Sequence, residues 1–309
     1  MTHDLRFSGV VPILATPFHA DESVDTESLD RLVRFMAALG VDGVTVLGVL
    51  GESNRLSDRD REVAISAAVA AAGAMPVIVG ASHPGTRATL DLIAMAADLG
   101  AKGVMVAASA EPVPNDDRLF EYYRRVGEGS TLPIILQDHP ASTSVHMTVP
   151  LLARIATEVP RIAGIKEEAT PTPPKLRAIR KALGGRELNI MTGLGALYGH
   201  FDLEAGSAGF NTGFAFPEVL MEMVAAARAA DWDRARRIYT RFLPLIVFEQ
   251  QPGVAVRKDI LRRRGLLAGS TVRHPGAGLP PGASEQLDAL IEATLPGVDL
   301  TKPLDRAGL

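Results

Sequence analysis

The sequence predicts an α/β protein, a (β/α)8 TIM barrel with a helical extension at its C-terminal end. Two observations support this prediction: eight short apolar runs lie along the chain, and stretches with helical periodicity separate them. The runs are apolar on both faces and bounded by Gly and Pro, as in parallel strands that are covered on both sides. Right-handed crossovers wind such strand and helix pairs in one direction, which closes a barrel.

The expected strands begin near residues 10, 43, 76, 103, 133, 162, 188 and 207, where the sequence reads VVPIL, GVTVLG, PVIVG, GVMVA, PIILQ, IAGIK, LNIMT and SAGFN. The helical stretches include 26–39, 57–73, 86–99, 148–157, 174–183 and 217–229. The motif LGxxGVxV starts at Leu39 and again at Leu99, which fits a repeated helix-to-strand junction. Chance explains this repeat equally well, because such junctions contain glycine in any α/β protein.

Residues 231–309 are expected to form the C-terminal extension, packed on a barrel made by residues 1–230. Helices are expected at 231–249, 253–264 and 284–294, and the Pro- and Gly-rich stretch 274–282 is expected to be a loop. No low-complexity linker separates the two parts. A flavodoxin-like doubly wound sheet is the alternative architecture.

Composition excludes several classes of protein. The 309 residues are 47% hydrophobic and 22% charged, which is enough apolar material for a large core. The formal net charge is -4 and no run of Lys or Arg occurs, so nucleic-acid binding is not expected. The absence of cysteine excludes disulfides, thiolate metal sites and a cysteine nucleophile. No signal pattern, membrane-length apolar run, HExxH motif or EF-hand loop is present, so we expect a cytoplasmic protein that binds no membrane and no metal.

Lys166 is the candidate nucleophile because it ends the expected strand IAGIK, and active sites of such barrels lie at the carboxyl ends of the strands. The other five lysines fall in helices or loops. Burial at a strand end lowers the pKa of a lysine, which yields the neutral amine that imine chemistry needs. A salt bridge between Lys166 and Glu167 or Glu168 is the structural alternative. Because side chains alternate along a strand, Glu168 shares the face of Lys166 and is a candidate acid or base, whereas Glu167 points the other way.

Four segments spread along the chain together form a specific pattern. They are VPILATPF at 11–18, GVLGES at 48–53, IAGIKEE at 162–168 and QPGVAVRKDILRRRG at 251–265. In sequence and order they resemble the dihydrodipicolinate synthase and N-acetylneuraminate lyase family of class I aldolases, over nearly the whole chain. The resemblance implies a TIM-barrel lyase in which Lys166 forms a Schiff base with a small 2-keto acid, with no cofactor besides this covalent imine. It also implies a homotetramer built from dimers.

In that family the loop after the second strand, GTTGE, holds the substrate carboxylate through backbone N–H groups and hydroxyls. The resemblance implies that the matching loop here binds the carboxylate with Gly48, Val49, Leu50, Gly51 and Ser53. Val49 and Leu50 replace hydroxyl residues that are common in the family, so we expect their backbone N–H groups to do this work. The structural alternative is a strand-to-helix turn in which a serine caps the helix, and both can hold at once.

The sequence departs from the family after the fifth strand. The family usually reads YNVP there, and its tyrosine relays protons, whereas this chain reads QDHP with Gln137 and His139. An amide does not relay protons, so we expect Glu168 and His139 to move them, with Gln137 holding a substrate oxygen or a water. A strand-end amide and a loop histidine are the simpler interpretations. Ser142 stands where synthases have an arginine for a second carboxylate, which argues against dihydrodipicolinate synthase activity.

Two further strand ends carry candidate substrate contacts. The sequence GLGALYG follows the seventh strand, where Thr192 and Gly193 are expected to line the cleft beside a helix N-terminus. Its spacing differs from GxGxxG, which argues against a dinucleotide site. Asn211 ends the eighth strand and is equally well explained as a contact for substrate hydroxyls or as a turn residue.

The sequence therefore favours a lyase that dehydrates a 2-keto-3-deoxy sugar acid. Lys166 and Glu168 supply an imine and a neighbouring carboxylate for removal of a C3 proton, whereas aldol cleavage in the family depends on the tyrosine that is missing here. A pyruvate-releasing aldolase is the alternative hypothesis. A keto-acid sensor without turnover is the third.

Overall fold

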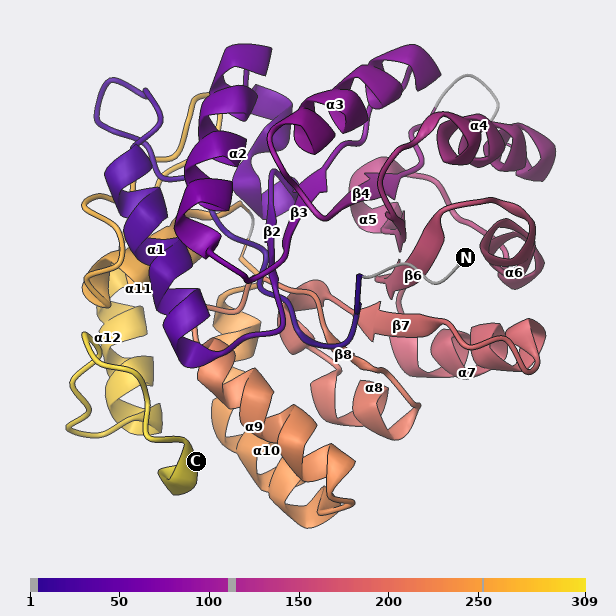
Figure 1. Cartoon of the computed structure of the whole chain (residues 1–309). Helices are drawn as coiled ribbons and strands as arrows, with labels where there is room; N and C mark the ends of the chain where they lie inside the picture. Colours follow the sequence, from indigo (N-terminus) through magenta and orange to yellow (C-terminus); the bar gives the residue numbers. More distant parts are fainter. Residues whose placement is uncertain (1–4, 111–114, 252) are drawn as a thin grey trace.

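The structure is a barrel of eight parallel strands (Figure 1), and the predicted (β/α)8 fold is confirmed. The computed structural model describes residues 5–110, 115–251 and 253–309. Neighbouring strands follow the order β1-β8-β7-β6-β5-β4-β3-β2, and a parallel bridge between Ile13 and Thr45 joins the two ends of the sheet. The strands are β1 (Gly9–Val10), β2 (Val44–Val46), β3 (Val77–Gly80), β4 (Gly103–Ala107), β5 (Ile134–Asp138), β6 (Ile162–Glu167), β7 (Asn189–Thr192) and β8 (Gly209–Phe210).

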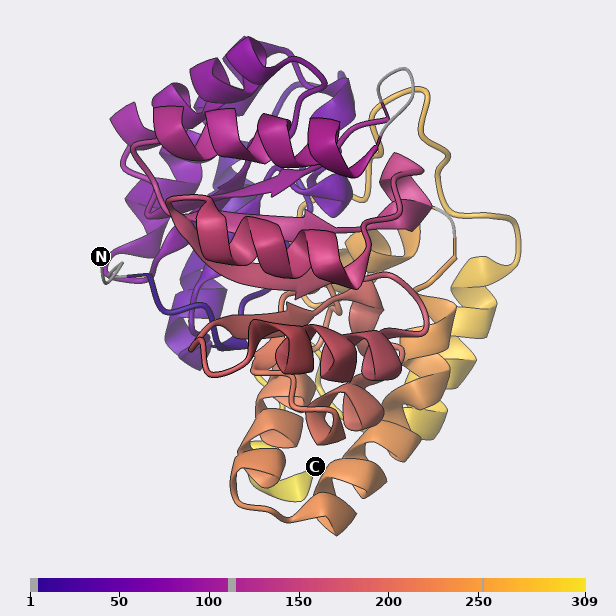
Figure 2. The same ribbon diagram turned by 90° about the vertical axis from the view of Figure 1, so that its right-hand side faces the viewer.

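Helices surround the strands on the outside of the barrel (Figure 2). They are α1 (Thr26–Leu39), α2 (Asp58–Ala72), α3 (Thr86–Asp98), α4 (Asp116–Gly129), α5 (Pro140–Thr143), α6 (Val149–Glu158), α7 (Thr172–Leu183), α8 (Gly199–Glu204) and α9 (Pro217–Arg228). The expected helical stretches agree with α1, α2, α3, α6, α7 and α9 to within a few residues. Helix α4 was not among them, because only Leu119, Tyr123 and Val126 form its buried apolar stripe among many charged residues.

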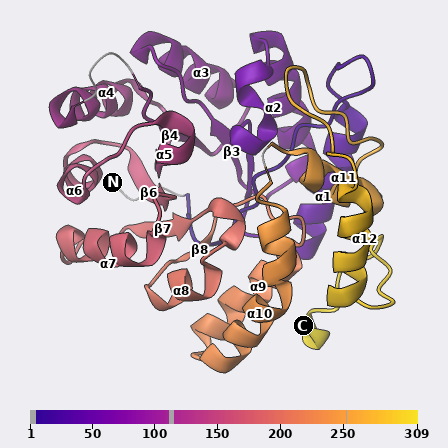
Figure 3. The ribbon, with the colours of Figure 1, turned by 180° about the vertical axis from the view of Figure 1, so that it is seen from behind.

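Three further helices follow the barrel: α10 (Trp232–Phe248), α11 (Ala255–Arg263) and α12 (Ala283–Thr294). Helix α12 packs against α10 (both labelled in Figure 3), and Arg31 of α1 donates a hydrogen bond of 3.2 Å to the carbonyl of Leu266, just after α11. Residues 274–282 contain no helix or strand, as expected for the Pro- and Gly-rich stretch. The division of the chain at residue 230 stays our proposal.

The inside of the barrel is apolar near the amino ends of the strands. The inner cluster consists of Leu5, Phe7, Val11, Ile13, Ile78, Met105, Ile135 and Met191. A Cβ on Gly164 of β6 would lie 2.6 Å from the ring of Phe7, so this strand needs a glycine there. Two residues further along β5 and β6, the inward positions are Gln137 and Lys166, which pair in the sheet. A polar layer therefore lies directly above an apolar one.

A buried ion pair joins the C-terminal segment to α9. The side chains of Arg264 and Glu218 are 1% and 0% exposed, and Arg264 Nη1 also donates a hydrogen bond of 2.6 Å to the carbonyl of Ala215. Removing one partner of such a pair leaves the other charge unpaired and away from water.

Replacing Arg264 with Met is expected to lower the free energy of unfolding by about 3–5 kcal/mol, measured by urea denaturation. The control is Arg34→Met, which removes an ion pair with Asp30 whose side chains are 64% and 44% exposed. This control should cost far less, because exposed ion pairs contribute little to stability. Equal losses in the two variants would contradict a stabilising role of the buried pair.

Candidate active site

The residues predicted to be catalytic surround one carboxylate oxygen inside the barrel. Lys166 Nζ lies 3.3 Å from Glu168 Oε2, and these two side chains are only 5% and 6% exposed. Gln137 Nε2 donates a hydrogen bond of 2.7 Å to the same oxygen, and His139 Nδ1 is 4.0 Å from it. All four predicted residues are thus brought together at the carboxyl ends of β5 and β6.

The register of β5 and β6 explains this convergence. Gln137 pairs with Lys166 along the two strands, and Asp138 pairs with Glu167. Because side chains alternate, the first pair faces the barrel interior and the second faces the helices. There, an oxygen of each side chain of the second pair contacts Lys175 Nζ on α7. The two neighbouring glutamates of this segment therefore lie on opposite faces, as the alternation predicts.

The electrostatics of the inner face keep Glu168 ionised. Burial raises the pKa of this carboxyl, but the positive charge of Lys166, together with His139 and the hydrogen bond from Gln137, outweighs burial and lowers the pKa below its ordinary value. The salt bridge considered as the alternative for Lys166 therefore exists, and it is made to the inner glutamate. An ionised carboxylate beside an amine is a base within reach of a carbon atom that the amine holds.

The backbone after β7 completes the surroundings of Glu168. The N–H group of Leu194 donates a hydrogen bond of 3.2 Å to Glu168 Oε1. A Cβ on Gly193 would lie 2.0 Å from the same oxygen, so any other residue would displace the carboxylate. The predicted contact residue Gly193 therefore lies at the site, where its lack of a side chain is the feature that counts.

The side chain of Thr192, also predicted to line the cleft, lies on the other face of β7. Its neighbour Met191 belongs to the inner cluster, and alternation directs Thr192 toward the helices. There, Thr192 Oγ1 is 3.5 Å from Ser207 Oγ. The structure therefore does not bring the Thr192 side chain together with the residues around Glu168.

Asn211 is buried inside the barrel, where it joins the last strand to the first two. Its Nδ2 donates hydrogen bonds of 2.7 Å to the carbonyl of Val11 and 3.0 Å to Thr45 Oγ1. Within the part of the chain that the structure describes, Asn211 Oδ1 has no hydrogen-bond partner. The amide thus joins β8 to the first two strands and holds the barrel closed.

The loop predicted to bind the carboxylate forms a turn of 3₁₀-helix, η1 (Val49–Gly51), directly after β2. The N–H group of Gly51 donates to the carbonyl of Gly48 at 2.9 Å. The N–H groups of Val49 and Leu50 come first in this turn, and a helix offers its first N–H groups no partner of its own. This leaves them available to an anion, and their role in binding the substrate carboxylate stays a prediction.

Two side chains shape this loop. The side chain of Leu50 packs against Gly213. A Cβ on Gly213 would lie 2.2 Å from Leu50 Cδ1, so this position needs a glycine. Ser53 begins the next turn, η2 (Ser53–Arg55), and Ser57 caps α2 in a capping box with Asp60. The loop is thus both a candidate anion site and a capped strand-to-helix turn.

His139 is held by α5, the single turn that follows β5. It occupies the N-cap position of this helix, and its Nδ1 lies 2.7 Å from Ser142 Oγ. Ser142, which replaces the arginine of the synthases, therefore orients the histidine ring in this chain.

The sequence analysis did not identify two groups of charged residues. One is Asp138 with Lys175 on the outer face, which alternation along β5 would have revealed. The other is Lys258 of α11, which is fully buried with its Nζ 2.5 Å from Glu52 Oε1. The sequence analysis placed Lys258 in a helix, but no local pattern indicates a partner so far away in the chain.

Within the described residues, no group of three or more His, Cys, Asp and Glu side chains is arranged to hold a metal ion. None of the described helices is long and apolar enough to cross a bilayer.

Comparisons with known proteins agree with this geometry. Residues 6–294 match the model of the dihydrodipicolinate synthetase family. The L-2-keto-3-deoxyarabonate dehydratase of Azospirillum brasilense is 33% identical over 291 residues, which are 92% of this chain and 94% of that protein. The 4-hydroxy-tetrahydrodipicolinate synthase of Methanosarcina acetivorans is 31% identical over 241 residues, covering 78% of this chain and 82% of the relative.

Among solved structures, the dihydrodipicolinate synthase from Rhodopseudomonas palustris has a TM-score of 0.90 and 36% identity, covering 94% of this chain and 100% of that chain. The resemblance seen in the four sequence segments is confirmed. The chain therefore belongs to the dihydrodipicolinate synthetase family, whose members are lyases that act through a lysine imine without an external cofactor.

Proposed function

We propose that this enzyme dehydrates a 2-keto-3-deoxy sugar acid through an imine on Lys166. The observation that carries the proposal is the position of Glu168, whose carboxylate lies 3.3 Å from Lys166 Nζ and accepts a hydrogen bond of 2.7 Å from Gln137. A base at this place suits removal of a proton from the carbon next to the imine. A relative that is 33% identical over most of the chain and bears the name of such a dehydratase supports the same reaction.

The first steps form the imine. The substrate carboxylate binds the N–H groups of Val49 and Leu50, which brings its C2 carbonyl to Lys166 Nζ. Lys166 transfers one ammonium proton to Glu168, and the resulting neutral amine attacks C2. The carbonyl oxygen then leaves as water, with one proton from the attacking nitrogen and one returned by Glu168, which gives an iminium ion and restores the carboxylate. The iminium withdraws electrons from C3 and makes the C3 protons acidic.

Elimination follows from the same intermediate. Glu168 takes a proton from C3, and the electron pair of the broken C–H bond moves toward nitrogen to form an enamine. The enamine then expels the C4 hydroxyl, which leaves as water with a proton that we assign to His139. Addition of water to the unsaturated iminium releases the dehydrated keto acid and regenerates the lysine, and return of the C3 proton from Glu168 to His139 restores both groups.

Aldol cleavage to pyruvate shares the imine and remains the alternative. It requires a base at the C4 hydroxyl rather than at C3. The tyrosine relay on which this reaction depends in the family is absent, since β5 continues into Gln137 and His139. Homotetramers are general among members of the family, and a homotetramer remains our expectation for this chain.

The products of a 2-keto-3-deoxypentonate distinguish the two reactions. Mass spectrometry or NMR should detect a keto acid lighter than the substrate by one water, without pyruvate. Pyruvate together with an aldehyde would reject dehydration in favour of cleavage. If neither product forms, exchange of the pyruvate methyl protons for deuterium separates an enzyme with another substrate from a sensor that makes no enamine.

Replacing Glu168 with Gln is expected to lower kcat by about 10²- to 10⁴-fold, because the base for C3 is lost. The matched control is Glu167→Gln on the outer face of the same strand. Burial, together with the negative charge of Asp138, raises the pKa of Glu167, which favours its protonated form. An amide imitates that state, and the control should keep kcat nearly unchanged. A similar loss in both variants would contradict the assignment of the base.

A further inference from the structure

A cluster of buried charges lies directly behind the loop at residues 48–52, which we call the carboxylate loop. Glu52 ends this loop, and its side chain is only 2% exposed. Its carboxylate contacts Lys258 Nζ at 2.5 Å and Arg55 Nη1 at 2.8 Å, and it accepts a hydrogen bond of 3.0 Å from the backbone N–H of Arg273. We call these four residues the Glu52 cluster.

Lys258 also contacts two other segments of the chain. Its Nζ donates a hydrogen bond of 2.7 Å to the carbonyl of Thr271 and lies 4.3 Å from the ring centre of Phe18. Burial lowers the pKa of Lys258 to about 8, while the negative charge of Glu52 opposes this shift. A buried ammonium is costly unless it is paired, so Lys258 and Glu52 hold each other in place.

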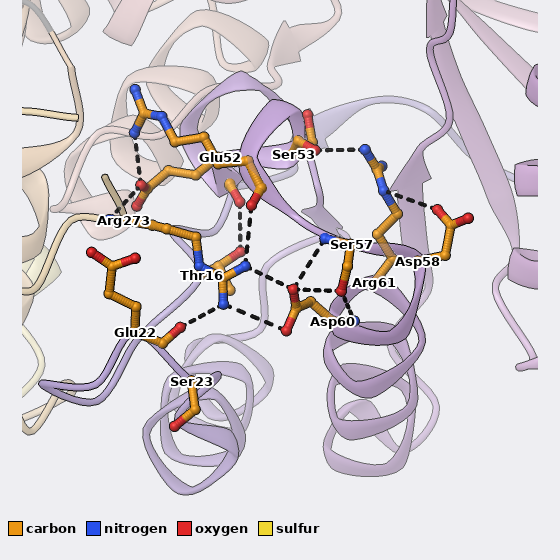
Figure 4. A network of polar contacts seen from close by, with 12 residues as sticks. Thr16, Glu22, Ser23, Glu52, Ser53, Ser57, Asp58, Asp60, Arg61 and Arg273 are labelled. Carbon is orange, nitrogen blue, oxygen red and sulfur yellow. Dashed lines mark hydrogen bonds and ion pairs between the residues drawn. The ribbon is translucent and has the colours of Figure 1, made fainter. Parts of the chain in front are cut away.

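Arg273, in the segment after α11, also binds residues next to the carboxylate loop. Figure 4 shows its side chain between Glu22 and Asp60. The guanidinium lies 2.7 Å from a carboxylate oxygen of Asp60, and it donates to the carbonyl of Arg55 at 3.1 Å. Asp60 belongs to the capping box of α2. The cluster therefore connects the carboxylate loop to both α2 and the segment after α11.

The loop itself is in a conformation that needs support. Glu52 has a φ of 56°, in the left-handed region that residues other than glycine adopt only at a cost. Thr16 Oγ1 donates a hydrogen bond of 2.7 Å to the carbonyl of Gly51, the residue before it. Contacts from three parts of the chain thus hold the last two residues of the loop.

We propose that Lys258 and Thr16 are positioning residues for the substrate carboxylate: through Glu52 and Gly51 they fix the backbone N–H groups of Val49 and Leu50. The proposal rests on the function proposed above. Val49 and Leu50 have no hydroxyl to offer an anion, so binding depends on how accurately two N–H groups are aimed. Preorganised donors bind an anion without a reorganisation cost at the moment of binding.

The test is Lys258→Met, with two ketones that differ in the carboxylate. Borohydride inactivates an enzyme that forms an imine, and the half-saturating ketone concentration reports binding. For pyruvate this concentration should rise about tenfold or more, since small displacements of positioning groups are costly. For hydroxyacetone, which lacks a carboxylate, it should stay nearly unchanged. With the sugar acid substrate, KM should rise more than kcat falls.

Two controls separate positioning from general damage. Arg264→Met also breaks a buried ion pair, but with Glu218 of α9, and it should leave both half-saturating concentrations unchanged. Should Lys258→Met not fold, Thr16→Val provides the test, with an expected rise of about fivefold for pyruvate alone. Its control is Ser130→Ala, which removes a hydrogen bond of 2.7 Å to the carbonyl of Leu132 at the opposite end of the barrel.

The results with the two ketones distinguish the positioning role from the imine function. An unchanged value for pyruvate, or equal losses for both ketones, overturns the positioning role. If the wild-type enzyme is not inactivated with either ketone, the proposed imine function itself fails.

Discussion

The contact between Lys166 and Glu168 is the interaction on which the rest of the site depends. Each side chain lies inside the barrel, where an unpaired charge would cost several kcal/mol. Their distance of 3.3 Å supplies the pairing, and Gln137 binds the carboxylate oxygen that faces the lysine. Gly193 leaves room for the other oxygen. The same arrangement that makes two buried charges tolerable thus places a base beside a nucleophile.

The fold could be predicted from local periodicity, and the centre of the site from periodicity together with the resemblance of four segments to a known family. Strands of a covered parallel sheet are apolar on both faces, and alternation decides which of two adjacent glutamates faces inward. Predictions for residues at the other strand ends rested on position alone and did not apply the alternation of side chains. Thr192 is an example, since its hydroxyl lies on the helix side of β7, near Ser207. Asn211 is another, because its amide joins three strands.

The supports of the loops could not be predicted, because they join residues that are distant in the chain. Glu52 lies after β2 and its partner Lys258 lies on α11, so no spacing rule relates them. The C-terminal segment after the barrel therefore also contacts the carboxylate loop, through Lys258. It places Lys258 behind the carboxylate loop, which in our proposal compensates for hydroxyl side chains that relatives often have there. Changes in substrate preference within this fold can arise in this way without new residues in the cleft.

The central claim is that the amine of Lys166 is the one that condenses with the substrate. The most direct measurement is borohydride reduction in the presence of pyruvate, followed by digestion and mass analysis of every lysine peptide. Our account predicts that the added mass of the reduced pyruvate lies on the peptide that contains Lys166 and on no other. Addition to Lys175 or Lys258 instead, or no addition at all, would contradict it.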